Sequence, residues 1–156
     1  MDHAEKAKEL FLAGYNCAQA VFCAFCDETG LDVDAAARLS SSFGGGMGRL
    51  REVCGTVSGV LMALGALCGY DDPTDPEAKK AHYQLVQEYA RRFREKHGSI
   101  VCRELLKDVP VTPGDTPEKR TPEFYARRPC LGLVCDAAAI LDEMLKEIRE
   151  NKEVSP

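Results

Sequence analysis

Cysteine is the residue type with the most reactive chemistry in this chain, which holds eight cysteines among 156 residues. Thiolates bind metal ions and attack disulfides, and their surroundings decide which of these they do. The first residues carry mixed charges and lack the basic and then apolar order of a signal peptide, so we expect a cytoplasmic location. Because thiols stay reduced there, we expect metal ligands or redox centres rather than structural disulfides.

Four of the cysteines occupy similar places relative to the expected helices. Each lies in the first turn of a helix, where unpaired N–H groups and the positive end of the dipole favour an anion and lower the thiol pKa. These candidate metal ligands, which are also the candidate catalytic thiols, are Cys17, Cys54, Cys102 and Cys130. If the fold gathers them, four thiolates suit an iron–sulfur cluster or a tetrahedral zinc ion. The alternative is that small cysteine side chains fill the tight first turns of a packed bundle.

The other four cysteines carry a weaker signal. Cys23 and Cys26 form a CxxC pair that we expect in the middle of a helix, away from the helix start that assists a redox thiol, so packing is the favoured interpretation. Asp27 follows the pair, where attachment of a c-type haem needs histidine. Cys68 and Cys135 are expected in the core, although Cys135 is close enough in sequence to the fourth candidate cysteine to act as a reserve ligand or resolving thiol.

A glycine-dense loop, residues 44–48, precedes the second candidate cysteine. Its glycines can adopt positive φ and turn several backbone N–H groups toward a bound anion, and Arg49 and Arg51 add positive charge. The Gly-Lys-Ser/Thr sequence of phosphate-binding loops is missing, so we do not expect a nucleotide site. The residues predicted to contact a cofactor are Gly45, Gly46, Gly48, Arg49 and Gly55. The alternative is a turn that lets two helices cross closely.

Hydrophobic periodicity predicts an all-α protein, a compact bundle of about six helices in a single domain over residues 1–156. Two amphipathic helices are expected first, one that carries residues 7–14 and one that begins after Asn16 and contains the CxxC pair, and a third is expected over 33–41. The apolar run 53–70 is expected to form a buried central helix, because it is short and glycine-rich for a membrane span.

The second half of the chain begins with a strong helix-start signal. Asp75 and Pro76 are expected to cap and start a long charged helix that ends near Lys96. Ser99 should cap a short helix over 100–107. A flexible, proline-rich loop is expected over 108–122, and a closing helix should begin near Pro129.

Acidic side chains outnumber basic ones by 25 to 20, which gives a formal net charge of −5. Nucleic-acid binding depends on a dense cationic surface, and the chain contains no basic block. We therefore expect neither nucleic acid nor a membrane among the partners.

Five ordered motifs resemble those of a known family. They are residues 16–20 (Asn-Cys-Ala-Gln-Ala), 44–48 (Gly-Gly-Gly-Met-Gly), 54–59 (Cys-Gly-Thr-Val-Ser-Gly), 99–106 (Ser-Ile-Val-Cys-Arg-Glu-Leu-Leu) and 130–134 (Cys-Leu-Gly-Leu-Val). The chain thereby resembles the redox-active proteins named for their C_GCAxxG_C_C cysteine pattern. The resemblance implies a helical redox domain whose four hallmark cysteines fall on the four candidate positions. Thr56 departs from the pattern, in which the family has alanine.

That family is similar to part of the split-Soret cytochromes c, which implies an electron-transfer setting, a redox partner protein and a homodimer. This sequence has no haem attachment motif, so no haem is expected. The leading hypothesis is electron transfer through an iron–sulfur cluster held by the four candidate cysteines. A metal-free thiol–disulfide oxidoreductase and a structural zinc or interaction module stay open, because thiolate clusters serve all three.

Overall fold

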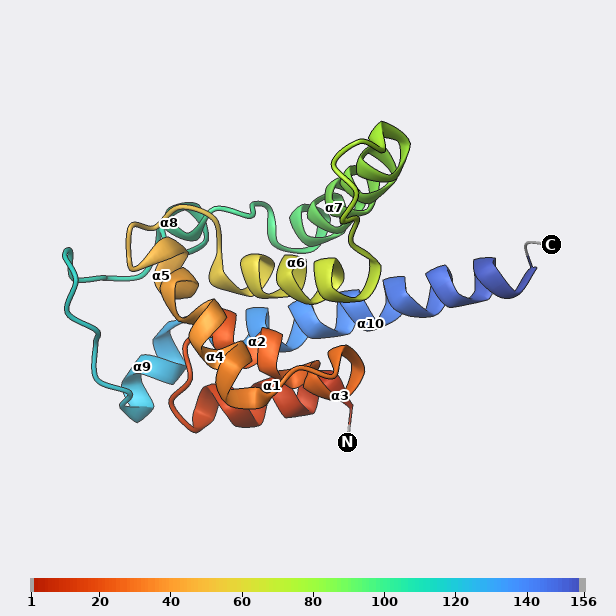
Figure 1. The fold of residues 1–156 in the computed structure, drawn as a ribbon. Coiled ribbons are helices and arrows are strands. Elements are labelled where there is room, and N and C mark those ends of the chain that lie inside the picture. Colours follow the sequence, from red (N-terminus) through yellow and green to blue (C-terminus); the bar gives the residue numbers. More distant parts are fainter. Residues whose placement is uncertain (1, 155–156) are drawn as a thin grey trace.

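The structure is a computed structural model that describes residues 2–154. In chain order its elements are α1 (His3–Leu12), α2 (Cys17–Ala24), α3 (Cys26–Thr29), α4 (Val33–Ser40), the 3-10 turn η1 (Ser41–Phe43), α5 (Gly44–Met47), α6 (Gly55–Cys68), α7 (Pro76–His97), α8 (Cys102–Leu105), α9 (Pro122–Arg127) and α10 (Cys130–Val154) (Figure 1). The described residues are 70% helical and include no strand, which confirms the all-α prediction. They form more helical segments than the six or so expected, because α3, α5 and α8 are single turns.

Helix α6 lies at the centre of the fold, with α2 and α10 packed against it (Figure 1). Val57, Val60 and Leu64 on α6 are at most 1% exposed. Burying a side chain of this size contributes about 1.5–3 kcal/mol. Gly59 lets α2 approach closely, since a Cβ atom there would lie 2.6 Å from the carbonyl oxygen of Ala18. The predicted buried central helix is confirmed, with narrower bounds than residues 53–70.

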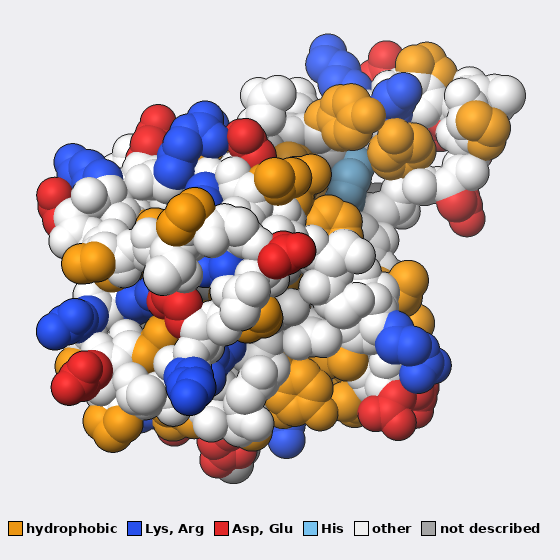
Figure 2. Space-filling view, turned by 90° about the vertical axis from the view of Figure 1, so that its left-hand side faces the viewer, with side chains coloured by type: hydrophobic (Ala, Val, Ile, Leu, Met, Phe, Trp, Pro, Cys, Tyr) orange, Lys and Arg blue, Asp and Glu red, His pale blue; other side chains and the backbone are white. Residues whose placement is uncertain are grey.

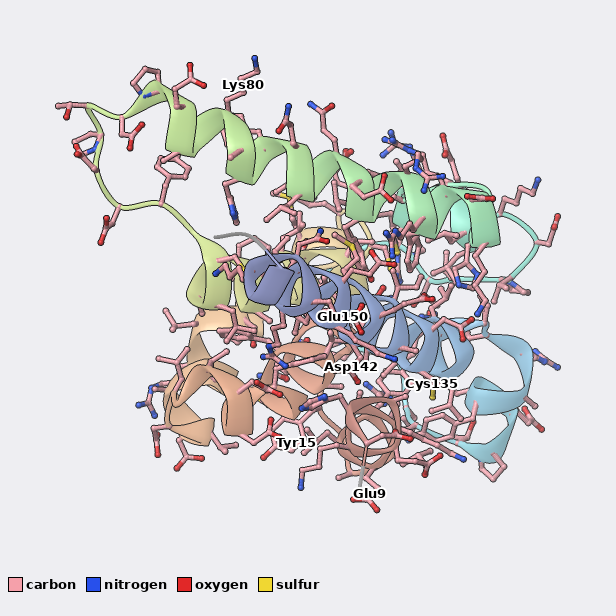
Figure 3. All side chains as sticks on the ribbon, turned by 90° about the vertical axis from the view of Figure 1, so that its right-hand side faces the viewer. Glu9, Tyr15, Lys80, Cys135, Asp142 and Glu150 are labelled. Carbon is pink, nitrogen blue, oxygen red and sulfur yellow. The ribbon has the colours of Figure 1, made fainter. Side chains whose placement is uncertain are left out.

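The remaining long helices cover this centre. Figure 3 shows α7, α10 and α1 as successive layers, with α10 between the other two. Helix α1 packs against α2 and α10, and α7 packs against α6 and α10. Tyr89 on α7 is fully buried, and its hydroxyl donates a hydrogen bond to the carbonyl oxygen of Ala137 on α10 at 2.9 Å. No helix in the described part of the chain combines the length and the apolar character needed to cross a membrane.

Local capping signals set where two important helices begin. The Asn16 side chain accepts from the Gln19 N–H at 2.9 Å, and the Gln19 side chain accepts from the Asn16 N–H at 3.0 Å. This capping box makes Cys17 the first residue of α2. Asp75 caps α7 and Pro76 occupies its first turn, so the predicted start of the long helix is confirmed.

Three other boundaries differ from the prediction. Ser99 does not cap α8, which has no side-chain cap and is much shorter than the expected helix over 100–107. Helix α9, which begins at Pro122, is missing from the prediction. The second expected helix, which was to contain the CxxC pair, ends at Ala24, and the separate turn α3 begins at Cys26. Neither glycine nor proline marks this break, so local sequence gives no warning of it.

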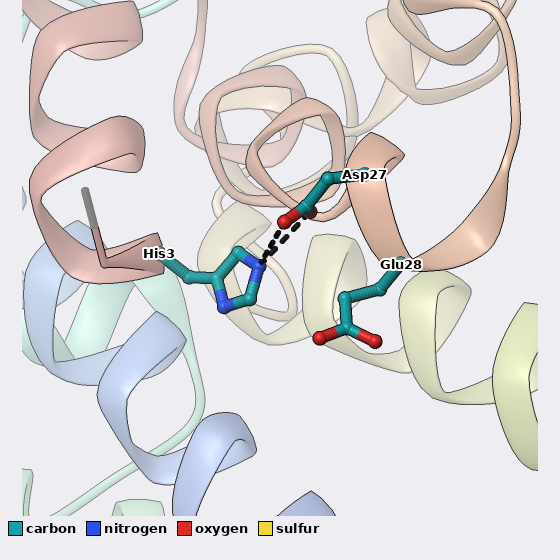
Figure 4. Close-up of side chains that lie close together, drawn as sticks. All are labelled: His3, Asp27 and Glu28. Carbon is teal, nitrogen blue, oxygen red and sulfur yellow. Dashed lines mark hydrogen bonds and ion pairs between the residues drawn. The ribbon is translucent and has the colours of Figure 1, made fainter.

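The His3 imidazole ties α1 to two other helices, and Figure 4 shows its contact with Asp27. His3 Nδ1 lies 2.6 Å from the carboxylate of Asp142 on α10, and Nε2 lies 2.9 Å from that of Asp27 on α3. Burial lowers the pKa of His3, but the hydrogen bonds and charges of the two carboxylates outweigh it, so the pKa is raised. Among the described residues, His3, Asp27 and Glu28 are the one group of three His, Cys, Asp or Glu side chains whose donor atoms lie within 4.8 Å of one another. Since carboxylates already engage both ring nitrogens, the group is an ion-pair network.

Candidate functional site

The four candidate cysteines line one cavity of about 280 Å³. Cys17, Cys102 and Cys130 are the first residues of α2, α8 and α10, and Cys54 immediately precedes α6. The cavity therefore lies where these four helices begin. The fold brings together four thiols that lie far apart in the sequence.

The predicted cofactor-contacting residues surround the same cavity. Those that line it are Gly45, Gly48, Gly55 and Arg49. Gly46 lies behind Cys102, where a Cβ atom would be 2.8 Å from the Cys102 Cβ. At Gly55 a Cβ atom would lie 2.3 Å from Cys17 Sγ. Glycine at these two positions therefore leaves room for two of the four cysteines.

Backbone pairing holds Cys54 and Cys102 side by side. Val53 and Val101 form an isolated antiparallel bridge. The Cys54 N–H donates to the carbonyl oxygen of Ile100 at 2.7 Å. The Cys102 N–H donates to the carbonyl oxygen of the residue before Val53. Two regions separated by α6 and α7 are thereby fixed in one register.

The glycine-dense loop forms one turn, α5, with an irregular backbone. Gly45 and Gly46 have φ values of 66° and 73°. Three non-glycine residues also have positive φ, between 61° and 70°: Met47, Arg49 and Arg51. Such backbone strain costs about 1–3 kcal/mol for each residue and gathers at functional sites. The Gly45 backbone lies near Cys17 and acts to lower the pKa of its thiol, against the larger effect of burial.

Arg51, rather than Arg49, is the arginine that faces the sulfurs. Its Nη1 donates to Cys102 Sγ at 3.8 Å. Its Nη2 is buried and has no hydrogen-bond partner among the described residues. A buried donor without an acceptor is costly, so this guanidinium is positioned for an anionic group inside the cavity.

Arg49 instead holds a loop over the cavity. Its guanidinium donates to the carbonyl oxygens of Thr112 and Gly114, at 2.9 Å each, and to that of Thr116. The carboxylate of Glu118 accepts from the Thr112 N–H at 3.0 Å and lies 3.5 Å from Arg49. The loop expected to be flexible is therefore tied down, and the donors of Arg49 are taken up by the protein itself.

Residues near α9 complete the cavity wall, and the sequence prediction does not include them. They are Glu118, Arg120, Phe124 and Arg128. Arg120 donates to the carbonyl oxygen of Phe11 at 2.9 Å and so joins this wall to α1. One local signal exists for α9, since Thr121 and Pro122 repeat the cap-and-proline pattern that begins α7. Figure 2 shows this side of the molecule, where Lys and Arg side chains intermingle with Asp and Glu.

Burial dominates the acidity of three cavity thiols, those of Cys17, Cys54 and Cys130. It raises the pKa of Cys17, and it raises the pKa of Cys54 and Cys130 to about 12. Neighbouring cysteines add to the rise, because one thiolate repels another. The Gly45 backbone, acting on Cys17, and Thr56, acting on Cys54, have the opposite effect on the pKa. The expected lowering of the pKa at helix starts is therefore outweighed, and a bound cation would be needed to keep these thiols ionised at neutral pH.

The sulfurs surround a volume rather than a point. Over residues 2–154, no three cysteine sulfurs lie within 4.8 Å of one another. Four thiolates on one zinc ion, each about 2.3 Å from the metal, would lie roughly 3.8 Å apart. In this arrangement the donor set fits a centre of several atoms better than a single ion.

The remaining cysteines lie outside the cavity, and all eight are free thiols. Cys68 ends α6, and Cys135 lies on α10, where Figure 3 labels it. Both are partly exposed, but Cys68 packs against the hydrophobic core and Cys135 does not, so the expectation of a core position is wrong for Cys135. Cys23 is buried and Cys26 is partly exposed, at the end of α2 away from Cys17.

Comparison with known proteins gives a family. Neither a curated protein nor a solved structure matches the chain. The family model described as "Putative redox-active protein (C_GCAxxG_C_C)" matches residues 15–144, a range that includes all four cavity cysteines. Because the match covers most of the sequence, the chain belongs to the C_GCAxxG_C_C family of redox-active proteins.

Proposed function

We propose that Cys17, Cys54, Cys102 and Cys130 hold an iron–sulfur cluster and that the protein transfers electrons through it. The observation that carries this proposal is the meeting of four thiols from four distant segments around one cavity. When bound, such a cluster supplies one-electron transfer at a potential that the protein adjusts.

The donor groups around the sulfurs have clear tasks in this proposal. Arg51 donates to Cys102, the Thr56 hydroxyl lies 3.1 Å from Cys54 Sγ, and the Gly45 backbone favours the thiolate of Cys17. Hydrogen bonds and positive charge near cluster thiolates stabilise the more negative, reduced state and raise the reduction potential. The unpartnered Nη2 of Arg51 supports an anionic occupant of the cavity.

Two alternatives receive less support. A structural zinc ion would need shorter distances between the sulfurs than this arrangement has. A metal-free dithiol in the cavity would need a thiolate as nucleophile, whereas burial raises the pKa of three of the four thiols. We keep both as outcomes of the experiment below.

The biological setting belongs to the same proposal. Electron transfer requires a redox partner protein, and we propose a cytoplasmic location, where a reduced thiol pool preserves the ligands. We also propose a homodimer, which light scattering of the cluster-loaded protein would test.

The test is purification without oxygen, followed by assays of iron, acid-labile sulfide and zinc and by an absorption spectrum. We expect iron and sulfide in comparable amounts in the wild-type protein. Cys54→Ser should lose most of the iron, and Cys68→Ser, which changes a partly exposed cysteine outside the cavity, should keep it. A colourless wild-type protein that also resists reconstitution would refute the proposal. Stoichiometric zinc without iron would favour the structural alternative.

A further inference from the structure

The loop over the cavity, residues 110–118, contributes to the cavity wall but not to the hydrophobic core. Asp115, Pro117 and Glu118 line the cavity. Each of residues 110–117 is exposed, and none of residues 110–118 belongs to the core or packs against it. Opening the loop would therefore cost little of the apolar burial that stabilises the rest of the fold.

Side chains alone hold this loop in place. None of residues 110–118 makes a backbone-to-backbone hydrogen bond, although the chain on either side of the loop does. Arg49 donates to the carbonyl oxygens of three loop residues. The Glu118 carboxylate forms ion pairs with both Arg49 and Arg128. We call the group of Arg49, Glu118 and Arg128 the latch. Segments held by few contacts and without buried side chains open at a low free energy.

The two arginines of the latch belong to fixed parts of the cavity wall. The Arg49 N–H donates to the carbonyl oxygen of Gly44 at 3.2 Å, and the N–H of Arg51, which faces the sulfurs, donates to that of Gly45 at 3.1 Å. Arg128 lies two residues before Cys130, the first residue of α10. Because the glycine-dense loop and α10 also position cavity cysteines, the part of the latch that can move is the loop over the cavity.

We propose that residues 110–118 form a gate, which opens as one unit when the latch releases and thereby controls entry to the four cavity thiols. Figure 1 shows this segment as a separate excursion between α8 and α9. Pro110, Pro113 and Pro117 restrict its backbone, so that it swings rather than collapses. The purpose of the gate rests on the proposed function, since iron and sulfide must enter the cavity and the assembled cluster must then be shielded from water.

The test is the rate at which N-ethylmaleimide, a neutral thiol reagent, alkylates each cysteine of the reduced, metal-free full chain. Mass spectrometry of the peptides assigns the label. Cys68 and Cys135 serve as internal references, because both are partly exposed and lie outside the cavity. In the wild-type protein the four cavity thiols should react more slowly than these references.

Arg49→Met should raise the alkylation rates of the cavity thiols about tenfold or more and leave both references unchanged, because the reaction follows the population of the open loop. The loss of a positive charge alone would disfavour the thiolates and slow the reaction. An acceleration therefore has the open gate as its cause. The urea midpoint of unfolding should stay close to that of the wild type, since the loop contributes no core residue.

Two further variants separate the gate from general effects of charge. Glu118→Ala should accelerate the same four thiols, and the double variant should react little faster than either single one, since both substitutions break one latch. Arg91→Met removes an equal charge from an exposed ion-pair group on α7 and should behave as the wild type.

Unchanged rates of the cavity thiols in Arg49→Met would overturn the proposal, and so would an equal acceleration of the references. Because the assay uses metal-free protein and a thiol reagent, the gate and the cluster fail separately. A closed loop in every variant would leave the cluster proposal untouched, and a protein without iron would leave the measured rates valid.

Discussion

Gly55→Ala should destabilise the protein, although alanine is a better helix former than glycine. The new Cβ would lie 2.3 Å from Cys17 Sγ and 2.9 Å from the carbonyl oxygen of Phe43. Cys17 cannot retreat easily, because the capping box around Asn16 fixes the start of α2. The substitution therefore forces two packed helices apart at the edge of the cavity.

The size of the effect follows from two opposing terms. Overpacking of a tight contact typically costs about 1–3 kcal/mol. Replacing glycine by alanine in a helix gains about 0.5–1 kcal/mol. We expect a net loss of about 1–2 kcal/mol, which lowers a urea midpoint by about 0.5–1 M at a typical slope of 2 kcal/mol/M.

Gly65→Ala is the matched control in the same helix. A Cβ at Gly65 meets no heavy atom within 4 Å, so only the helix-propensity gain remains and the free energy of unfolding should rise. The assay is urea unfolding of the metal-free, reduced protein, followed by circular dichroism. Equal stabilisation by both substitutions would refute the close contact between the start of α6 and Cys17.

Three further predictions concern other contacts. Arg49→Met removes the hydrogen bonds to the loop over the cavity, so the rate of amide hydrogen exchange in residues 112–118 should rise about tenfold for each 1.4 kcal/mol of loop stability that is lost. Unchanged exchange rates would show that Arg49 does not hold this loop. Because the pKa of His3 is raised in the folded state, its stabilising contribution is complete below the unfolded value of 6.5 and is lost as the pH rises through the folded value. The stability difference between wild type and His3→Gln should therefore shrink from acidic to alkaline pH in urea titrations, and a constant difference would contradict the ion-pair network. Tyr89→Phe should cost about 1 kcal/mol in the same assay, since the carbonyl oxygen of Ala137 loses its buried donor, and a neutral result would show that this bond contributes nothing net.

Much of the helical framework is predictable from short-range signals. Asp75 caps the long helix as predicted, and Asn16 and Asp32 cap α2 and α4 in the same way, because a cap depends on atoms only three residues apart. Of the cavity cysteines, Cys17 follows directly from such a cap, whereas Cys54 precedes α6 and Cys102 begins α8 without a side-chain cap.

The inner wall of the cavity could not be predicted in the same way. Arg49 and Arg51 are two residues apart and chemically identical, yet one binds a loop and the other faces the sulfurs. That difference depends on the positive φ values of the loop and on contacts with residues 112–118, which lie far away in the sequence. The break at Phe25 could not be predicted either, because neither glycine nor proline marks it.

The bridge between Val53 and Val101 has a consequence for variation in length. The bridge joins the two ends of the segment that contains α6 and α7. The spacing of Cys54 and Cys102 at these ends therefore does not depend on the turn between the two helices, residues 70–76, which is the far tip of the segment. The tip projects from the body of the molecule in Figure 1 and is largely exposed. Insertions or deletions at this turn are therefore expected to leave the spacing of Cys54 and Cys102 intact, and natural homologues should differ in length there more than anywhere else between the two.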